Sequence, residues 1–280
     1  MEDCVLAGVD GSDAGQAALD WAVDEAARRG LRVEALRATS RPLFEAYSED
    51  AYTAFAAGAQ ESLDKAAAAA RDRHPDVPVT TRVSPDFPAA ALIAADVRLL
   101  VVGSRGRSAL PGSAAGSVAY QVAAHAPGPV VVVGTEPVVA TGEVLVGVDG
   151  VRDAQVPLRA AYVEAQARRA RIRAVHTWRH PTSPGSGDLF FPVHDRESAE
   201  RDEQRRLAEA LAGWKTDDPG QVYVAEVHHA AAVPVLTRLS ATAELLVVGA
   251  RGRHGFPLLA LGSVAYGVLH HARCPVLIAR

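Results

Sequence analysis

Two glycine-rich loops contain the residues best suited to chemistry in this sequence. Both have the spacing Gly-x2-Gly-x9-Gly-Ser, and the residues are Gly103, Gly106, Gly116 and Ser117 in one loop and Gly249, Gly252, Gly262 and Ser263 in the other. Glycine allows positive φ and lets the main chain approach a ligand without an intervening Cβ. The Gly-Ser pair opens a predicted helix whose free amides and positive dipole end favour phosphate, and the Ser hydroxyl can donate one more hydrogen bond. The two loops are therefore predicted phosphate-binding sites.

The same residues can also have a purely structural role. Two glycines after a strand are often only a turn, and Ser after Gly is often only a helix N-cap. The exact repetition of the spacing, at the same place relative to an aspartate, favours the phosphate interpretation. Val118 and Val264, which follow the two serines, are included in the predicted sites.

An aspartate ends the first apolar run of each copy. Asp10 is followed by Gly11 and Ser12, and Asp149 is followed by Gly150. In an open parallel sheet, ligands bind beyond the carboxyl ends of the strands where the winding direction reverses. We therefore expect each aspartate to lie beside the glycine loop of its own copy.

The loops and aspartates belong to an internal duplication. Residues 6–11 recur at 145–150, an offset of 139, whereas 99–107 and 116–120 recur at 245–253 and 262–266, an offset of 146. The second copy therefore has a net insertion of seven residues, which we place in the Pro/Gly/Ser stretch 180–187. Three matched blocks in the same order predict two domains, 1–136 and 143–280.

The strands and helices that position these residues are predicted from alternating strand-like and helix-like periodicities. In the first copy they predict strands at 5–9, 31–38, 77–83, 99–103 and 130–133, and helices at 47–73, 89–95 and 116–125. They also predict a first helix with Ser12 or Asp13 as its N-cap and Gly30 as its stop signal. In the second copy they predict strands at 144–148, 172–177, 222–227, 245–249 and 276–279, and helices at 153–169, 196–214, 233–240 and 263–271. The predicted fold class is α/β: two tandem doubly wound five-stranded parallel sheets with strand order 3-2-1-4-5, similar to adenine nucleotide alpha hydrolases.

Composition narrows the possible partners. The formal net charge is −4, which gives no electrostatic reason to expect nucleic acid or an anionic membrane surface. No apolar run approaches the roughly 20 residues that span a bilayer. Cys4 and Cys274 lack Cys or His neighbours at metal-ligand spacing and are expected to be free thiols in a reducing cytoplasm.

The sequence lacks the motifs of several well-known kinds of active site. The only lysines are Lys65 and Lys215, so no P-loop lysine is available, and no G-x-S-x-G, H-E-x-x-H or C-x-x-C motif occurs. The adjacent pairs His228-His229 and His270-His271 point in diverging directions on a strand or helix and are not expected to chelate one ion. We predict no catalytic residue and no dedicated metal site.

The Val9-Asp10-Gly11-Ser12 segment, the glycine loops and the ending 271–276 together resemble the universal stress protein family in its tandem-domain form. The resemblance covers nearly the whole chain. It implies binding of ATP, or of ADP or AMP, with or without Mg²⁺. It also implies that the two copies pair through their last strands as an intramolecular pseudo-dimer, with further homodimerisation left open.

The resemblance also implies particular site residues. In the first copy they are Asp10, Gly11, Ser12, Gly103, Gly106, Gly116, Ser117 and Val118, with Ala38 at the adenine edge; in the second they are Asp149, Gly150, Gly249, Gly252, Gly262, Ser263 and Val264, with Thr177 beside the base. Arg105 and Arg251 lie within the loops and either offset phosphate charge or are solvated surface residues. Val151 replaces the residue that matches Ser12, which makes the second site the less certain one.

The sequence is compatible with three functions. The first is a nucleotide-binding stress or regulatory protein that acts on an unknown protein partner and hydrolyses ATP slowly at most, because no base to activate water is evident. The second is an adenylate-forming or nucleotidyl-transfer enzyme, whose H-I-G-H and S-G-G-x-D-S signatures are absent. The third is an interaction module without nucleotide.

Overall fold

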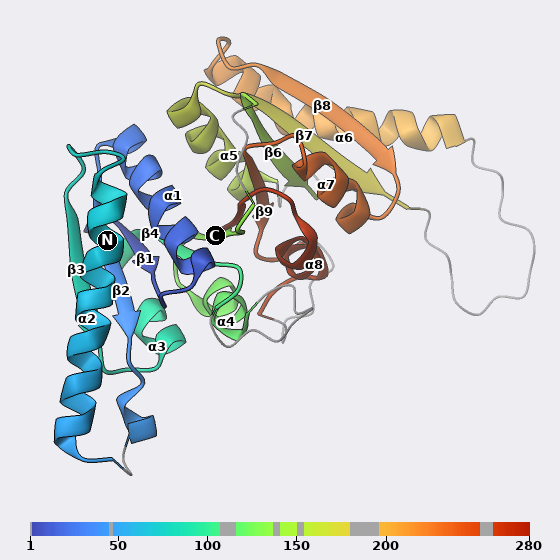
Figure 1. Cartoon of the computed structure of the whole chain (residues 1–280). Helices are drawn as coiled ribbons and strands as arrows, with labels where there is room; N and C mark the ends of the chain where they lie inside the picture. The colour runs from blue at the N-terminus through green and yellow to red at the C-terminus, as the bar shows by residue number, and fades with distance from the viewer. Residues whose placement is uncertain are drawn as a thin grey trace, which may run out of the picture.

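The computed structural model describes residues 2–44, 47–106, 116–136, 141–149, 154–179, 196–252 and 260–280. Within these residues all strands belong to one sheet with the order β3-β2-β1-β4-β5-β10-β9-β6-β7-β8 (Figure 1). The strands of the first half are β1 Glu2–Gly8, β2 Arg32–Ala38, β3 Val79–Ser84, β4 Val97–Gly103 and β5 Val130–Val133. Those of the second half are β6 Glu143–Val148, β7 Arg171–Trp178, β8 Tyr223–His229, β9 Leu245–Gly249 and β10 Val276–Ala279.

Each half has the predicted strand order 3-2-1-4-5, and all of the pairs within a half are parallel. The predicted fold class is confirmed. The two five-stranded sheets do not remain separate, because β5 and β10 pair antiparallel with Val132 opposite Val276. The expected pairing of the last strands is therefore present, and it relates the halves by a pseudo-two-fold axis.

Helices cover both faces of the sheet. They are α1 Asp13–Arg29, α2 Glu49–Arg71, α3 Pro88–Ile93, α4 Ser117–His125, α5 Gln155–Arg168, α6 Arg196–Asp217, α7 Ala232–Ser240 and α8 Ser263–His271, with a short 3-10 turn η1 at Arg41–Phe44. One buried apolar cluster joins α1, α2, α5 and α6 to the sheet, and a second joins α3, α4, α7 and α8 to the opposite face. Successive residues of β1 divide between the clusters: Val5 and Ala7 belong to one and Leu6 to the other. This arrangement explains why the strands are continuously apolar.

Local signals set the ends of α1 as expected. Ser12 is the N-cap, and its side-chain oxygen accepts from the amide of Gly15 at 3.1 Å. Gly30 ends the helix in the left-handed conformation with φ 65°. The predicted start of the third strand at residue 77 is wrong, because the amide of Val77 bonds to the carbonyl of His74 in a turn and the strand begins only after Pro78.

Four buried charged residues join α1 to α5 across the pseudo-two-fold. The repeat offset of 139 relates Glu25 to Glu164 and Arg29 to Arg168. Each arginine binds the glutamate of its own helix and the glutamate of the other, and Arg168 Nη2 lies 2.6 Å from Glu25 Oε2. We call these four residues the charge square. It closes with equal numbers of positive and negative charges, although its glutamates are almost fully buried.

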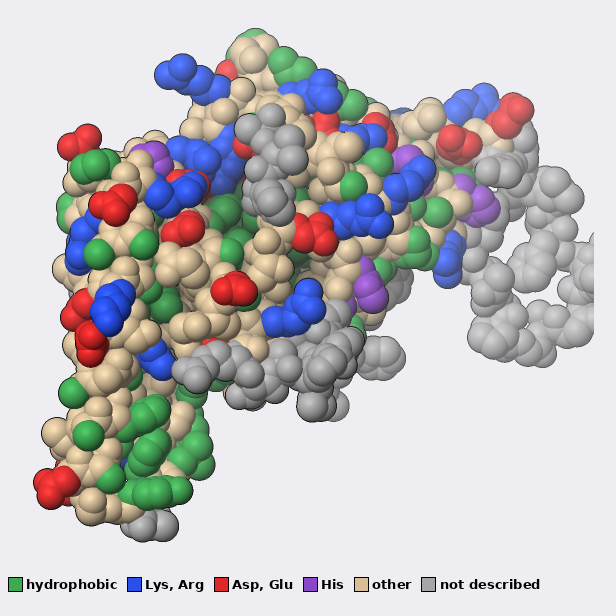
Figure 2. Space-filling view, viewed as in Figure 1, with side chains coloured by type: hydrophobic (Ala, Val, Ile, Leu, Met, Phe, Trp, Pro, Cys, Tyr) green, Lys and Arg blue, Asp and Glu red, His purple; other side chains and the backbone are tan. Residues whose placement is uncertain are grey.

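An apolar patch is exposed at the end of the first half farthest from the second, near η1 and the start of α2 (Figure 2). Leu43 and Tyr47 are 68% and 65% exposed, and the rings of Phe44 and Phe55 stack against each other with centroids 4.8 Å apart. The hydroxyl of Tyr52 lies 2.9 Å from Thr39 Oγ1, just beyond the end of β2. Tyr52 therefore connects the start of α2 to the carboxyl end of β2, at the sheet edge where ligands are expected.

Candidate functional site

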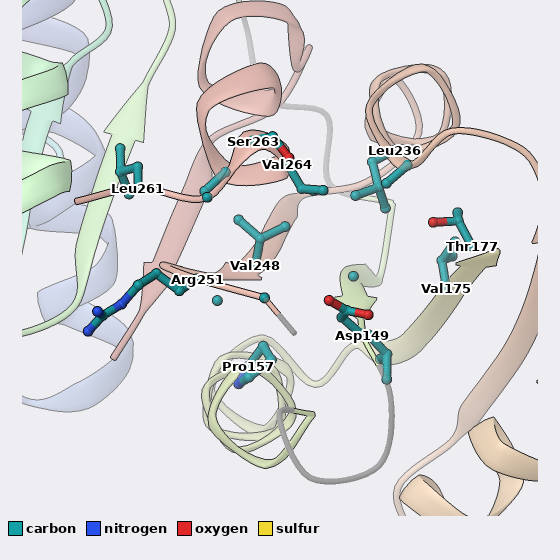
Figure 3. A pocket seen from close by; sticks show the side chains of 17 residues that line it. Asp149, Pro157, Val175, Thr177, Leu236, Val248, Arg251, Leu261, Ser263 and Val264 are labelled. Carbon is teal, nitrogen blue, oxygen red and sulfur yellow. The ribbon is translucent and has the colours of Figure 1, made fainter. Parts of the chain in front are cut away.

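A pocket of about 480 Å³ opens at the carboxyl ends of β6, β7 and β9 in the second half (Figure 3). Its walls come from these strand ends, the starts of α7 and α8, and Pro157 of α5. The predicted site residues that line it are Asp149, Thr177, Gly249, Arg251, Gly252, Gly262, Ser263 and Val264. Gly150 lies outside the described residues.

Gly252 of the second loop is required by the close approach of the loop to Asp149. A Cβ on Gly252 would lie 2.6 Å from Asp149 Oδ2, closer than any stable contact. The amide of Gly262 donates to the carbonyl of Ala250 at 2.8 Å, which closes the loop in front of α8. The aspartate and the loop therefore form one unit at the base of the pocket, although they lie about 100 residues apart in the sequence.

The first half repeats this geometry. A Cβ on Gly106 would lie 2.8 Å from Asp10 Oδ2, and the amide of Gly116 donates to the carbonyl of Ser104 at 2.7 Å. The structure thus brings Asp10 to the first loop as it brings Asp149 to the second. Ser117 begins α4 and Val118 follows it, at the same positions as Ser263 and Val264 on α8.

Asp10 also organises the turn into α1. Its Oδ1 accepts hydrogen bonds from Ser12 N at 3.0 Å and from Ser12 Oγ at 2.5 Å. Gly11 between them has φ +81°, which suits glycine. These bonds leave Oδ2 as the oxygen that faces Gly106.

The halves differ where the first helix of each begins. By the offset of 139, the start of α1 at Asp13 corresponds to residue 152, yet α5 begins at Gln155. In the first half the main chain of Ala14 packs so closely on Gly103 that a Cβ there would meet it at 2.6 Å. In the second half the atoms nearest to the Cβ position of Gly249 are the carbonyl oxygen of Arg251 at 3.1 Å and the side chain of Pro157 at 3.9 Å. The counterpart of Ala14, residue 153, lies outside the described residues, so the expected ranking of the two sites stays a prediction.

Ala38 and Thr177 lie at or near the ends of the second strand of each half. Thr177 and Val175 project from the end of β7 on the side of the pocket opposite Pro157 and Arg251 (Figure 3). Ala38 ends β2 at the equivalent place and packs on the apolar cluster below it. The adenine contact that the resemblance implies for these two residues stays a prediction.

The loop arginines are placed differently from the glycines. The Arg251 side chain extends away from Asp149 (Figure 3), and Arg105 lines another cavity, between the two halves. Neither makes an ion pair with a described carboxylate. Their proposed role in offsetting phosphate charge stays a prediction.

The described residues contain no group of three or more His, Cys, Asp or Glu side chains that would hold a metal ion. His228 bonds to Glu226 at 3.0 Å, and the ring of His229 stacks on Trp178 with centroids 4.4 Å apart. Among the same residues, no helix combines the length and apolar character that crossing a bilayer requires.

Cys274 is buried, and burial raises the pKa of its thiol to about 12. Because the thiolate is the nucleophile, we expect Cys274 to resist iodoacetamide in the native protein at pH 8, while both thiols react after denaturation in guanidinium. Mass spectrometry of the labelled peptides measures both rates. Labelling of native Cys274 at the rate of a free cysteine would contradict this environment.

Sequence reasoning identified the glycines and aspartates but missed the apolar walls of the pocket. Leu236 of α7, Leu261 and Val248 line it together with Pro157. Leu261 and Val248 lie next to glycines already singled out, so proximity in sequence was an available signal. Pro157 and Leu236 belong to other helices and had no comparable signal.

Fold and site together define a tandem α/β protein. Each half has a glycine loop and a strand-end aspartate at the carboxyl edge of its sheet. The family model described as "Universal stress protein family" matches residues 1–134 and 141–280. The chain therefore belongs to the universal stress protein family.

Similar proteins span the same length. Universal stress protein Rv1996 of Mycobacterium tuberculosis is 31% identical over 305 residues, covering 99% of this chain and 94% of its own. Universal stress protein Rv2005c of the same organism is 31% identical over 291 residues, with 99% and 96% covered. The crystal structure of a universal stress protein from Archaeoglobus fulgidus is similar with a TM-score of 0.71 at 18% identity, covering 99% and 96% of the two chains. That likeness concerns the fold.

Proposed function

We propose that the second-half pocket binds an adenine nucleotide, with phosphates on the main chain of the second glycine loop and the base beside Thr177. The observation that carries the proposal is the close approach of Gly252 to Asp149 Oδ2, which leaves no room for a side chain at position 252 and places a carboxylate at the pocket floor. The first amides of α8, which begins at Ser263, have no acceptor within the helix and suit phosphate oxygens. The carboxylate suits ribose hydroxyls.

The first half is proposed to bind the same ligand class through Asp10, Gly106, Gly116 and Ser117, because it repeats the close approach of the loop glycine to the strand-end aspartate. Mg²⁺ would be held mainly by the oxygens of the triphosphate, which hard cations favour, and not by a dedicated protein site.

Binding rather than rapid catalysis is the proposed activity. The described side chains that line the pocket supply one carboxylate, Asp149, and no histidine or lysine to activate water. Occupancy would instead bias the protein toward a conformation that a cytoplasmic partner recognises in a stress or regulatory response.

The direct test has two measurements on the full chain. Nucleotide released by acid denaturation is identified by chromatography, and ATP, ADP, AMP and GTP are titrated calorimetrically with and without Mg²⁺. We expect an adenine nucleotide to bind and to raise the melting temperature, because ligands that bind only the native state stabilise it. An empty extract together with no heat and no shift for every nucleotide would overturn the proposal, and fast release of AMP or transfer to an acceptor would favour the enzyme alternative.

A further inference from the structure

A second cavity, of about 290 Å³, lies between the two halves beside the β5–β10 seam. Arg105, Gly134 and Glu136 line it from the first half, and Leu269, His270 and Arg273 line it from the second. None of these residues except Arg105 belongs to the predicted nucleotide sites. The cavity therefore needs its own explanation.

The pseudo-two-fold shows what fills the equivalent place on the other side of the seam. The offset of 146 relates Arg105 to Arg251, Gly134 to Arg280, and Ala123 to Leu269. There the guanidinium of Arg280 donates a hydrogen bond to the carbonyl of Ala123 near the end of α4. The cavity exists because Gly134 has no side chain where Arg280 has a long one.

The helix carbonyl explains why a guanidinium suits this place. The residue four positions after Ala123 is Pro127, which has no N–H to complete the helix, so Arg280 supplies the donor. Four positions after Leu269 stands Arg273, whose amide donates instead to Ser240 Oγ at 3.0 Å. Among the described residues, no group donates to the Leu269 carbonyl.

The cavity is lined by charged side chains of both signs. Arg105 and Arg273 are exposed, and neither forms an ion pair with a described residue. Glu136 supplies one carboxylate on the same wall. A ligand with a carboxylate would meet the arginines, and its cationic end would meet Glu136 and the Leu269 carbonyl.

We propose that this cavity binds a small guanidinium-bearing zwitterion of the arginine type, with the guanidinium on the Leu269 carbonyl in the manner of Arg280 on Ala123. A planar guanidinium with several N–H donors can bond a carbonyl and a carboxylate together. The volume is ample for one amino acid.

The occupied side shows that a guanidinium tolerates the neighbouring arginine. Burial lowers the pKa of Arg280, and the positive charge of Arg251 lowers it further. The open side has Arg105 in place of Arg251 and adds Arg273 and Glu136, whose opposite charges offset each other. A bound guanidinium would therefore meet the same net positive charge in the open cavity as Arg280 meets in its own place.

Gly134→Arg is the decisive variant, because it places in the cavity the side chain that the other side already has. The site tolerates a side chain: a Cβ on Gly134 would meet nothing closer than the amide nitrogen of Glu136 at 4.0 Å, and its φ is not positive. Gly134→Ala is the matched control, since it adds a Cβ without filling the cavity.

L-arginine is titrated calorimetrically into the full chain and its variants. We expect one molecule per wild-type chain, unchanged binding in Gly134→Ala, and at least about tenfold weaker binding in Gly134→Arg. Agmatine, which lacks the carboxylate, should bind about tenfold more weakly than arginine.

Absence of arginine binding to the wild type, or equal binding to Gly134→Arg and wild type, would overturn the proposal. Gly252→Ala separates this result from the nucleotide hypothesis. That variant changes the second-half pocket and should leave arginine binding as it is. The two proposals can therefore fail independently.

Discussion

Gly252→Ala is expected to weaken adenine-nucleotide binding to the second-half pocket by about 30- to 100-fold, a loss of roughly 2–3 kcal/mol. The new Cβ would lie 2.6 Å from Asp149 Oδ2, so either the carboxylate or the loop must move. Moving the loop misaligns the amides proposed to bind phosphate, and moving Asp149 removes the carboxylate proposed for the ribose. Calorimetric titration with ATP measures the loss.

Gly213→Ala is the matched control for this substitution. Gly213 is exposed on α6, and a Cβ there meets nothing within 4 Å. The change should leave nucleotide affinity unaltered and stabilise the helix by about 0.5–1 kcal/mol. Gly106→Ala tests the first half in the same way, since its Cβ would lie 2.8 Å from Asp10 Oδ2. Equal ATP affinity in Gly252→Ala, Gly213→Ala and wild type would remove the loop from the proposed mechanism.

Arg168→Met is expected to lower the free energy of unfolding by about 3–5 kcal/mol. Arg168 is 3% exposed and binds both Glu25 and Glu164, so its loss leaves two buried carboxylates facing one arginine. It also removes the guanidinium that lies 5.6 Å from the centre of the Trp21 ring. Urea unfolding of the full chain, followed by circular dichroism, measures the change.

Lys65→Met is the corresponding control on the surface. Lys65 pairs with Glu61 on α2, and the two side chains are 74% and 69% exposed, so we expect a change of at most about 0.5 kcal/mol. Adding Glu164→Gln to Arg168→Met restores charge balance in the square and should recover part of the lost stability. A single Arg168→Met variant as stable as Lys65→Met would show that the charge square contributes little.

The two glutamates of the square respond differently to their surroundings. Burial would raise the pKa of Glu25, but the charges of Arg168, Arg29 and Arg28 outweigh it and leave the pKa below its ordinary 4.5. Burial and the charge of Glu25 raise the pKa of Glu164. The two pKa values shift in opposite directions in part because of one sequence difference. Arg28 Nη1 lies 3.4 Å from Glu25 Oε2, whereas the residue that corresponds to Arg28 in the second half is the uncharged Ala167.

These directions give a sign to the pH dependence. The contribution of Glu25 is complete above its unfolded pKa and is lost as the pH falls through the lower folded value, whereas ionised Glu164 costs stability. At pH 7, Glu25→Gln is therefore expected to destabilise the protein more than Glu164→Gln does. The opposite order in urea unfolding would contradict these directions.

Much of the site was predictable because its signals are local and repeated. The strand order follows from alternating periodicities, and the glycine loops stand out because main-chain approach requires missing side chains at fixed spacing. Asp10 and Asp149 could be placed beside their loops because strands 1 and 4 adjoin in a doubly wound sheet. The end of α1 at Gly30 was equally local, since only its own turn determines it.

Only the tertiary structure decided the contacts between elements distant in the chain. Glu25 and Arg168 are 143 residues apart in the chain but form an ion pair in the structure. The cavity at Gly134 can be explained only by comparison with the other half, where the Arg280 side chain fills the equivalent place. The sequence by itself determined each half, because a half is built from neighbouring elements. Folding decided how the halves meet, because antiparallel pairing of β5 with β10 brings together side chains whose spacing in the chain has no fixed relation to their distance in space.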